Sequence, residues 1–336
     1  MNNRDKYWDT LKFLLIFFVV YAHTIAGFHP NGSLNNAIYS FIRVFHMPLF
    51  IFISGRFSHI RDLDIYKLGI LRIFETYIVF QFIRWSMSRL LSGSISFDLI
   101  LSFLLNPQYT LWYLICLIYW RLIVMLIPQS LLLKKPIIVL ALCFSISIFG
   151  GFVPVNILSL QRAMTFLPFF FMGYYSTEID LKKWLSKIPI GIPVISVLIS
   201  FLFIYFYMNF NIGFVLNGKT TYWSYSSLSP FVLCIARCVF ILAAIFVSFM
   251  VMCLVRVQPL MAKMGKATLA IYIFHSFITQ GISFFIKQGY LPLPDKEVSL
   301  FVVAVAITIG LAYLSRFKIV KIILNPITYA KNGYQI

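Results

Sequence analysis

A lysine and a histidine in the first apolar segment have residue types and a spacing that suit catalysis. Lys12 precedes His23 by eleven residues, which is about 16 Å along a helix. Steps of about 100° per residue return both side chains to nearly the same helix face. A lysine at the start of the segment suits an anionic ligand, and an imidazole, whose pKa lies near physiological pH, can act as a general base. The alternative is a neutral histidine that is hydrogen-bonded to a neighbouring helix.

The composition indicates that this segment lies in lipid. Of 336 residues, 61% are hydrophobic and 11% are charged, and the mean hydropathy is +0.90, whereas a soluble domain carries about 25% charged residues. No polar stretch is long enough for a soluble domain, so we predict a single integral membrane domain over residues 1–336. The first apolar run is interrupted by His23 and lacks a clear small-residue cleavage site, so we interpret it as a retained span.

The apolar runs predict an all-α, polytopic bundle of about ten transmembrane helices, because a helix needs about 20 mostly apolar residues to cross a membrane. The predicted spans are 10–28, 38–56, 70–91, 110–128, 136–151, 163–177, 189–209, 230–255, 268–286 and 298–315. A further apolar stretch, 97–106, is too short to cross unaided.

Lysine and arginine residues are unevenly distributed between these spans. They gather before the first span and after each even-numbered span, and few occur in the alternate connections. Since positive residues beside a span remain on the cytoplasmic side, the pattern predicts that both termini are cytoplasmic. The net charge of +18 forms no basic face, so we expect membrane lipid and not nucleic acid as the partner of these residues.

Ionisable residues within a span are costly, and they are usually functional or paired. Besides His23, the predicted spans contain Arg43, His46, Glu75, Arg84, Arg121, Arg237 and His275. Interhelical hydrogen bonds are the alternative interpretation of His46 and His275, and an interfacial ion pair with Arg72 is that of Glu75. The five cysteines lack the spacing of a zinc site, so we interpret them as buried free thiols and expect no bound metal.

Five short segments occur in an order that resembles the membrane acyltransferase-3 family, whose members O-acylate carbohydrates, and most closely its fucose 4-O-acetylase-like branch. The segments are Asp9, Lys12 and His23 in the first span, Phe-His-Met-Pro-Leu-Phe-Ile-Phe-Ile-Ser-Gly ending at Gly55, Leu-Trp-Tyr-Leu at Leu111–Leu114, Arg162 followed by Phe-Leu-Pro-Phe-Phe-Phe-Met-Gly-Tyr, and Gly-Lys-Ala-Thr-Leu-Ala-Ile-Tyr-Ile-Phe-His ending at His275. Together they extend from Asp9 to His275, which is most of the chain.

The start of the third span departs from this resemblance. Many members of the family have two arginines separated by two residues at this point, followed by a proline. Here Arg72 matches the second arginine, but Gly69 takes the place of the first and Thr76 that of the proline. Lys67 and Arg56 are the candidates that we weigh for the missing cation.

The resemblance implies a reaction and a donor. Acetyl-CoA, a substrate and not a bound cofactor, would arrive from the cytoplasm and place its phosphates near Lys12, Arg72 and Arg56. His23 would take the proton from an attacking hydroxyl or carry the acyl group as an acyl-histidine, and the residues do not separate these two roles. Asp9 would orient or neutralise Lys12.

The resemblance also implies an acceptor. His46, Trp112, Arg162 and His275 would line the cavity for a carbohydrate or lipid-linked glycan, since aromatic faces and a few hydrogen-bonding groups suit a sugar. We expect the protein in the bacterial cytoplasmic (inner) membrane. Two alternatives stay open: a transporter or flippase for a glycan precursor, although no internal repeat is evident, and an O-succinyltransferase that acts on an exopolysaccharide.

Overall fold

The computed structural model describes residues 5–28, 32–92, 103, 105–155, 157–207, 217–224, 228–292 and 296–326, and the side chains of 88–92 are not part of that description. All regular structure in these residues is helical, which confirms the predicted all-α class. Most of the short apolar stretch 97–106 and the last two residues of the seventh predicted span lie outside the described residues.

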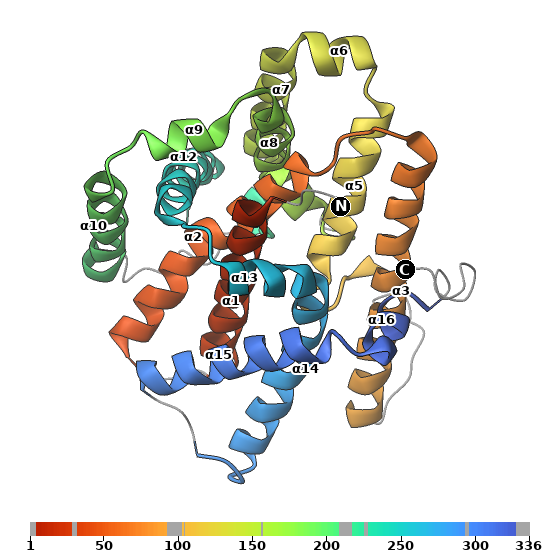
Figure 1. Cartoon of the computed structure of the whole chain (residues 1–336), viewed down its shortest axis with the longest axis vertical. Coiled ribbons are helices and arrows are strands. Elements are labelled where there is room, and N and C mark those ends of the chain that lie inside the picture. The colour runs from red at the N-terminus through yellow and green to blue at the C-terminus, as the bar shows by residue number, and fades with distance from the viewer. Residues whose placement is uncertain are drawn as a thin grey trace. The chain divides into compact units, whose positions relative to one another are not determined.

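Each of the ten predicted spans coincides with a helix (Figure 1). These helices are α1 Lys6–Phe28, α2 Ser33–Arg56, α3 Leu63–Ser92, α5 Trp112–Leu126, α7 Pro136–Phe149, α8 Leu160–Tyr175, α10 Gly191–Tyr207, α12 Pro230–Leu254, α14 Thr268–Lys287 and α15 Glu297–Leu314. Four short helices were not expected: α6 Gln129–Lys134, α9 Leu181–Ser186, α13 Pro259–Met264 and α16 Lys318–Leu324. Four 3₁₀ turns cover Gly150–Phe152 (η1), Ser176–Glu178 (η2), Tyr222–Ser224 (η3) and Gly265–Ala267 (η4).

Local sequence explains several of these boundaries. Pro136 and Pro259 stand in the first turn of α7 and α13, where the missing N–H would have no partner in the helix anyway. Asp180 caps α9 by accepting a hydrogen bond from the backbone N–H of Lys183 at 3.3 Å, which satisfies one of the free donors at the helix start.

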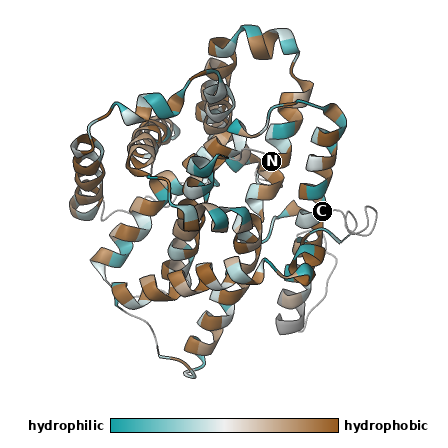
Figure 2. Ribbon diagram, in the orientation of Figure 1, coloured by the Kyte–Doolittle hydropathy of each residue, from teal (hydrophilic) through white to brown (hydrophobic). Residues whose placement is uncertain are grey.

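The described helices are those of an integral membrane protein. Five are long and apolar enough to cross a membrane: α1, α2, α12, α13 together with α14, and α15; shorter apolar helices are α5, α7 with η1, and α10. Large apolar side chains of α10 are exposed along most of its length, from Ile192 to Tyr207, and Figure 2 shows the same helix as largely hydrophobic. Such a surface suits lipid and not water. Which side of the membrane each end faces stays a prediction.

The chain divides into two compact units. The first comprises residues 1–53, 176–216 and 238–317. Within it α1 packs against α13, η4, α14 and α15, and Figure 1 shows α1, in red, beside the blue helices α13 and α14. The core of α1 contains the fully buried Leu11, Leu15, Ile16 and Val20. The hydroxyl of Tyr7 donates to the carbonyl of Met252 at 2.8 Å.

A glycine allows two backbone segments to approach closely in this unit. A Cβ atom added to Gly265 would lie 2.1 Å from the carbonyl oxygen of Asp9. The φ of Gly265 is −59°, which any residue can adopt, so the reason for glycine here is space and not backbone conformation. The contact brings the first of the five segments against the last.

The second unit comprises residues 54–175, 217–237 and 318–336, and its main contacts join α3 to α5, α5 to α8 and α7 to α8. Gly55 allows another close approach, because a Cβ atom there would lie 1.8 Å from the carbonyl oxygen of Phe170. Beside it, the hydroxyls of Ser54 and Tyr113 are hydrogen-bonded. The Nε1 of Trp120 donates to the carbonyl of Ala163 at 3.0 Å. The end of the second segment, at Ser54 and Gly55, therefore packs against the third and fourth segments.

Candidate active site

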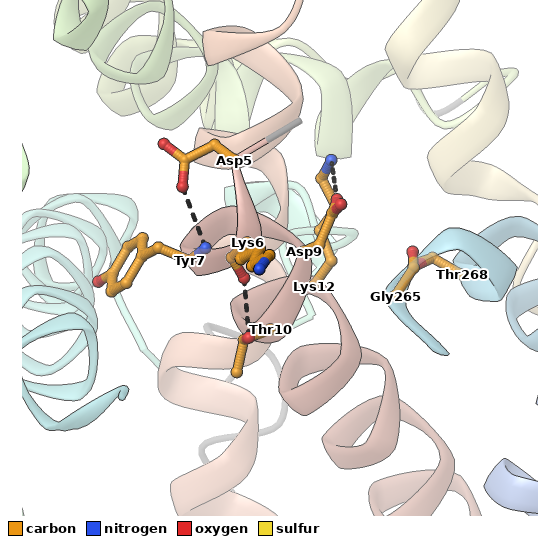
Figure 3. Close-up of polar contacts among 8 residues, drawn as sticks. All are labelled: Asp5, Lys6, Tyr7, Asp9, Thr10, Lys12, Gly265 and Thr268. Carbon is orange, nitrogen blue, oxygen red and sulfur yellow. Dashed lines mark hydrogen bonds and ion pairs between the residues drawn. The ribbon is translucent and has the colours of Figure 1, made fainter. Parts of the chain in front are cut away.

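The beginning of α1 holds Lys12 beside a buried carboxylate. The Lys12 Nζ lies 3.4 Å from the Asp9 Oδ1, one helical turn away (Figure 3). The side chain of Asp9 is 5% exposed and that of Lys12 is 21% exposed, so the ammonium group is the more accessible of the two. Because the Asp9 backbone is pressed against Gly265, the orientation of the carboxylate depends on the packing of η4. That Asp9 orients Lys12 for a ligand stays a prediction.

Contacts of Asp5 and Thr10 fix the first turns of α1. Asp5 accepts a hydrogen bond from the backbone N–H of Tyr7 at 3.0 Å and forms an ion pair with Lys182 of α9. Thr10 Oγ1 donates to the carbonyl of Lys6 at 2.8 Å (Figure 3). These contacts hold the first turns of α1 in place, and Lys12 is carried on the same turns.

Two histidine rings lie against each other, one on α1 beyond Lys12 and the other on α14. The rings of His23 and His275 lie with centroids 5.2 Å apart and planes inclined by 44°. His275, on α14, is completely buried, whereas His23 is half-buried. The two residues are 252 positions apart in the chain, and the packing of α1 on α14 brings them together.

The hydrogen bond of His275 assigns its tautomer. Its Nδ1 lies 2.9 Å from the carbonyl oxygen of Ile271, and since a carbonyl can only accept, Nδ1 carries the hydrogen. In the neutral ring the lone pair is therefore on Nε2. His46 is similar: it is 7% exposed, and its Nδ1 donates to the carbonyl of Ile42 at 2.7 Å. In both residues Nδ1 is bonded within its own helix and not to a neighbouring one.

The predicted donor contacts Arg72 and Arg56 belong to the second unit. Arg56 is half-buried at the end of α2, and Arg72 is half-buried in the third turn of α3. Thr76 Oγ1, one turn further, donates to the carbonyl oxygens of Arg72 at 2.9 Å and Leu324 at 3.0 Å. Thr76 thus places a hydroxyl at this point of α3 that links α3 to α16.

Trp112 and Arg162 form a cation–aromatic pair in the second unit. The guanidinium carbon of Arg162 lies 4.6 Å from the centroid of the Trp112 ring, and its Nε donates to the carbonyl of Asn217 at 3.2 Å. The ring of Phe166 stacks on Trp112 with centroids 5.7 Å apart. A planar cation on a broad aromatic face is an arrangement that can bind a sugar ring and its polar substituents.

The sequence-predicted residues thus form three groups: Asp9 with Lys12, His23 with His275, and Trp112 with Arg162. Arg56, Arg72 and His46 lie outside these pairs. Their functional roles stay predictions. Among the residues that the structure describes, no group of three or more His, Cys, Asp or Glu side chains is placed to hold a metal ion.

Sequence reasoning assigned no role to Arg121, a residue whose only signal was its charge within an apolar span. Its guanidinium lies at the start of α3, where a Cβ atom added to Gly69 would be 3.2 Å from Nη1. Periodicity places a residue on a face of its own helix and carries no information about the neighbouring helix.

Comparison with known proteins identifies the family. The family described as "Acyltransferase domain" (Acyl_transf_3) matches residues 5–316, a range that includes all the candidate residues above. No curated protein and no solved structure matches the chain. Because the match covers far more than half of the sequence, the chain belongs to the acyltransferase-3 family and is a membrane acyltransferase.

Proposed function

We propose that this protein transfers an acetyl group from acetyl-CoA to a hydroxyl of a cell-surface or lipid-linked carbohydrate, in the bacterial cytoplasmic membrane. His23 acts as the general base. The observation that carries the proposal is the juxtaposition of His23 and His275 within a helical membrane protein of this family. The order of the five segments, which resembles the fucose 4-O-acetylase-like branch, supports a sugar as acceptor.

The reaction needs one base and no redox partner. A sugar hydroxyl gives its proton to the neutral imidazole of His23 while its oxygen attacks the thioester carbonyl. The C–S bond then breaks, the acyl group stays on the sugar oxygen, and the departing thiolate of CoA takes the proton from the imidazolium. His275, whose Nδ1 is bonded to Ile271, lies against the His23 ring with centroids 5.2 Å apart.

The distance between Lys12 and His23 suits the donor. Eleven residues of helix span about 16 Å, and the extended pantetheine arm of CoA separates the thioester from the diphosphate by a similar length. With Lys12 on the diphosphate, the thioester carbonyl would come near His23 on the same helix face. The Lys12–Asp9 contact of 3.4 Å then holds the ammonium group in position before the donor binds.

Replacing Lys12 by glutamine is expected to raise the KM for acetyl-CoA about tenfold while the KM for the acceptor stays unchanged. The reason is the loss of a charge-assisted contact to phosphate. Steady-state kinetics with the purified protein in proteoliposomes measure both constants. Lys6→Gln is the matched control, because Lys6 lies on the same helix and is exposed. Equal donor KM values for the two variants would argue against this role of Lys12.

Replacing Trp112 by leucine is expected to raise the KM for the acceptor about tenfold and to leave the KM for acetyl-CoA unchanged. The substitution removes the aromatic face on which Arg162 lies at 4.6 Å and against which a sugar would pack. Trp184→Leu serves as the control, since Trp184 is 64% exposed on α9. An altered donor KM with a normal acceptor KM would contradict the assignment of Trp112 to the acceptor.

Mass spectrometry of surface glycans from otherwise identical strains with and without the gene tests the whole proposal. An added mass of one acetyl group, present only with the gene, is the expected result and would locate the acceptor. A succinyl mass would change the donor but not the reaction. Movement of a glycan precursor across proteoliposomes with no consumption of acyl-CoA would instead favour a transporter.

A further inference from the structure

Arg121 is the only charged residue of α5, whose sequence from Trp112 to Leu126 is otherwise apolar apart from two tyrosines and a cysteine. A charged side chain within an apolar span is costly, so its retention calls for an explanation. Arg121 lies in the part of the helix that leads towards Lys134 and Lys135. By the positive-inside pattern, this is the cytoplasmic half, from which an acyl-CoA would approach.

Three contacts hold this arginine at the beginning of α3. Its Nε donates to Ser58 Oγ at 3.3 Å, and its guanidinium carbon lies 5.8 Å from the centroid of the Tyr66 ring. The hydroxyl of Tyr66 donates in turn to the backbone carbonyl of Arg121 at 3.1 Å. The guanidinium is therefore anchored through Nε. Because the group is planar, this contact also fixes the direction in which its two Nη atoms point.

The Nη1 end points at Gly69. A Cβ atom added there would lie 3.2 Å from Nη1, which is closer than ordinary van der Waals contact. The guanidinium of Arg121 thus occupies space that a side chain at position 69 would need. Gly69 and Arg72 are three residues apart on α3, so they lie on adjacent turns of one helix face.

We propose that Arg121 provides a second cation beside Arg72 for the phosphates of the acyl-CoA donor. The inference rests on the proposed function and extends it by a residue from a different helix. A guanidinium binds phosphate oxygens through two parallel N–H donors, which makes arginine well suited to this task. From α5, the guanidinium reaches Gly69 on the helix that carries Arg72.

Lys67, the other candidate cation on α3, is less suitable. Its Nζ lies 3.9 Å from Asp64 Oδ1, and its side chain is 52% exposed. An ammonium group this exposed is strongly hydrated, so a phosphate contact made by it gains less than one made by a partly buried guanidinium. Arg56 precedes Ser58, the hydrogen-bond partner of Arg121, by two residues, and it remains a candidate for a further phosphate contact.

The simpler role for Arg121 is to clamp α5 to the segment between α2 and α3. The two roles predict different effects on two acyl donors, one with the nucleotide of CoA and one without it. A phosphate contact stabilises the binding of acetyl-CoA and contributes nothing to a donor that lacks the nucleotide, such as acetyl-pantetheine. A clamp supports the shape of the whole site, so its loss would affect both donors alike.

The test compares the full-length wild type with Arg121→Gln in proteoliposomes, with acetyl-CoA and with acetyl-pantetheine as donors. We expect the KM for acetyl-CoA to rise about tenfold or more, and the KM for acetyl-pantetheine and for the acceptor to stay unchanged. Arg61→Gln, an exposed arginine of the same segment, is the matched control and is expected to behave as wild type. An equal loss with both donors, or an unchanged KM for acetyl-CoA, would overturn the proposal.

A double variant guards against simple misfolding. In Arg121→Ala with Gly69→Arg, the guanidinium approaches the same place from α3, into the space that Arg121 has vacated. We expect this variant to recover at least part of the affinity for acetyl-CoA that Arg121→Ala alone loses. If it recovers none while Arg121→Lys retains affinity, the result would count against a phosphate contact at the place that the two guanidinium groups share. Equilibrium binding of CoA provides a readout without turnover. If the wild type binds CoA but transfers no acyl group, the proposed function fails and the inference about Arg121 is still decided by binding.

Discussion

His23→Ala is expected to reduce acyl transfer by about 10²–10⁴-fold, which is the contribution of a well-placed general base. The imidazole of His23 is the group that takes the proton from the acceptor hydroxyl in the proposed mechanism. Membrane insertion should be unchanged, because the buried apolar residues of α1 are retained. The measurement is the initial rate of acetyl transfer, normalised to the amount of folded protein by fluorescence-detected size-exclusion chromatography.

The neighbouring residue offers a matched control. Thr24 is fully buried, and its hydroxyl donates to the carbonyl of Val20 at 2.9 Å within the same helix. Thr24→Val keeps the shape of the side chain and removes a polar group from α1, and we expect a rate close to that of wild type. A His23→Ala variant with the same rate as Thr24→Val would remove His23 from the mechanism.

A labelling experiment separates the two roles that His23 can take. The protein is incubated with acetyl-CoA labelled in the acetyl group, without acceptor, and is then denatured. A general base leaves the protein unlabelled, whereas an acyl-histidine intermediate leaves label on the peptide that contains His23. The proposal of a general base predicts no label above that of His23→Ala.

Gly265→Ala is expected to destabilise the protein strongly. The added methyl group would lie 2.1 Å from the carbonyl oxygen of Asp9, a backbone atom that cannot turn aside as a flexible side chain would, so α1 and η4 must separate. Overpacking typically costs about 1–3 kcal/mol and occasionally more, and for 336 residues a cost of about 1–3 kcal/mol corresponds to a fall of about 1–4 °C in the apparent melting temperature in detergent. Acyl transfer should fall as well, because the displaced backbone carries Asp9 and, three residues on, Lys12.

Gly281→Ala is the control for this substitution. Gly281 lies on α14, the helix that follows η4, and a Cβ atom there would meet no atom within 4 Å beyond its chain neighbours and the backbone of its own helix. Alanine also has the higher helix propensity, by about 1 kcal/mol. We therefore expect the melting temperature of Gly281→Ala to equal or exceed that of wild type. Equal melting temperatures for Gly265→Ala and Gly281→Ala would show that the approach of η4 to α1 is looser than described.

The sequence by itself determined the helices and the class of protein. Apolar runs of about 20 residues have few structures open to them in lipid, because backbone groups must be satisfied within the segment. For this reason all ten predicted spans, from α1 to α15, coincide with helices. The short helices α6, α9, α13 and α16 were not predicted, since six or seven residues carry too little periodic signal. The order of the five segments was enough to identify the family that the match over 5–316 shows.

The candidate site was only partly predictable. The common face of Lys12 and His23 follows from the geometry of one helix, and Asp9 lies one turn from Lys12 for the same reason. The pairing of His23 with His275, however, joins residues 252 positions apart. A single sequence shows that both are costly in a membrane, but it does not show that each lies against the other.

Only the tertiary structure decided why particular small and charged residues stand where they do. Gly265 reads in the sequence as an ordinary glycine, and its φ of −59° makes no special demand; the carbonyl of Asp9 is what excludes a side chain. Gly69 likewise carries no sign of its surroundings in the sequence, and only the structure shows that the guanidinium of Arg121, from α5, occupies the space that a side chain there would need. Steric exclusion and charge placement are properties of two segments in contact, whereas hydropathy and helical periodicity are properties of one. The sequence therefore determined which helices form, and their packing decided which residues meet.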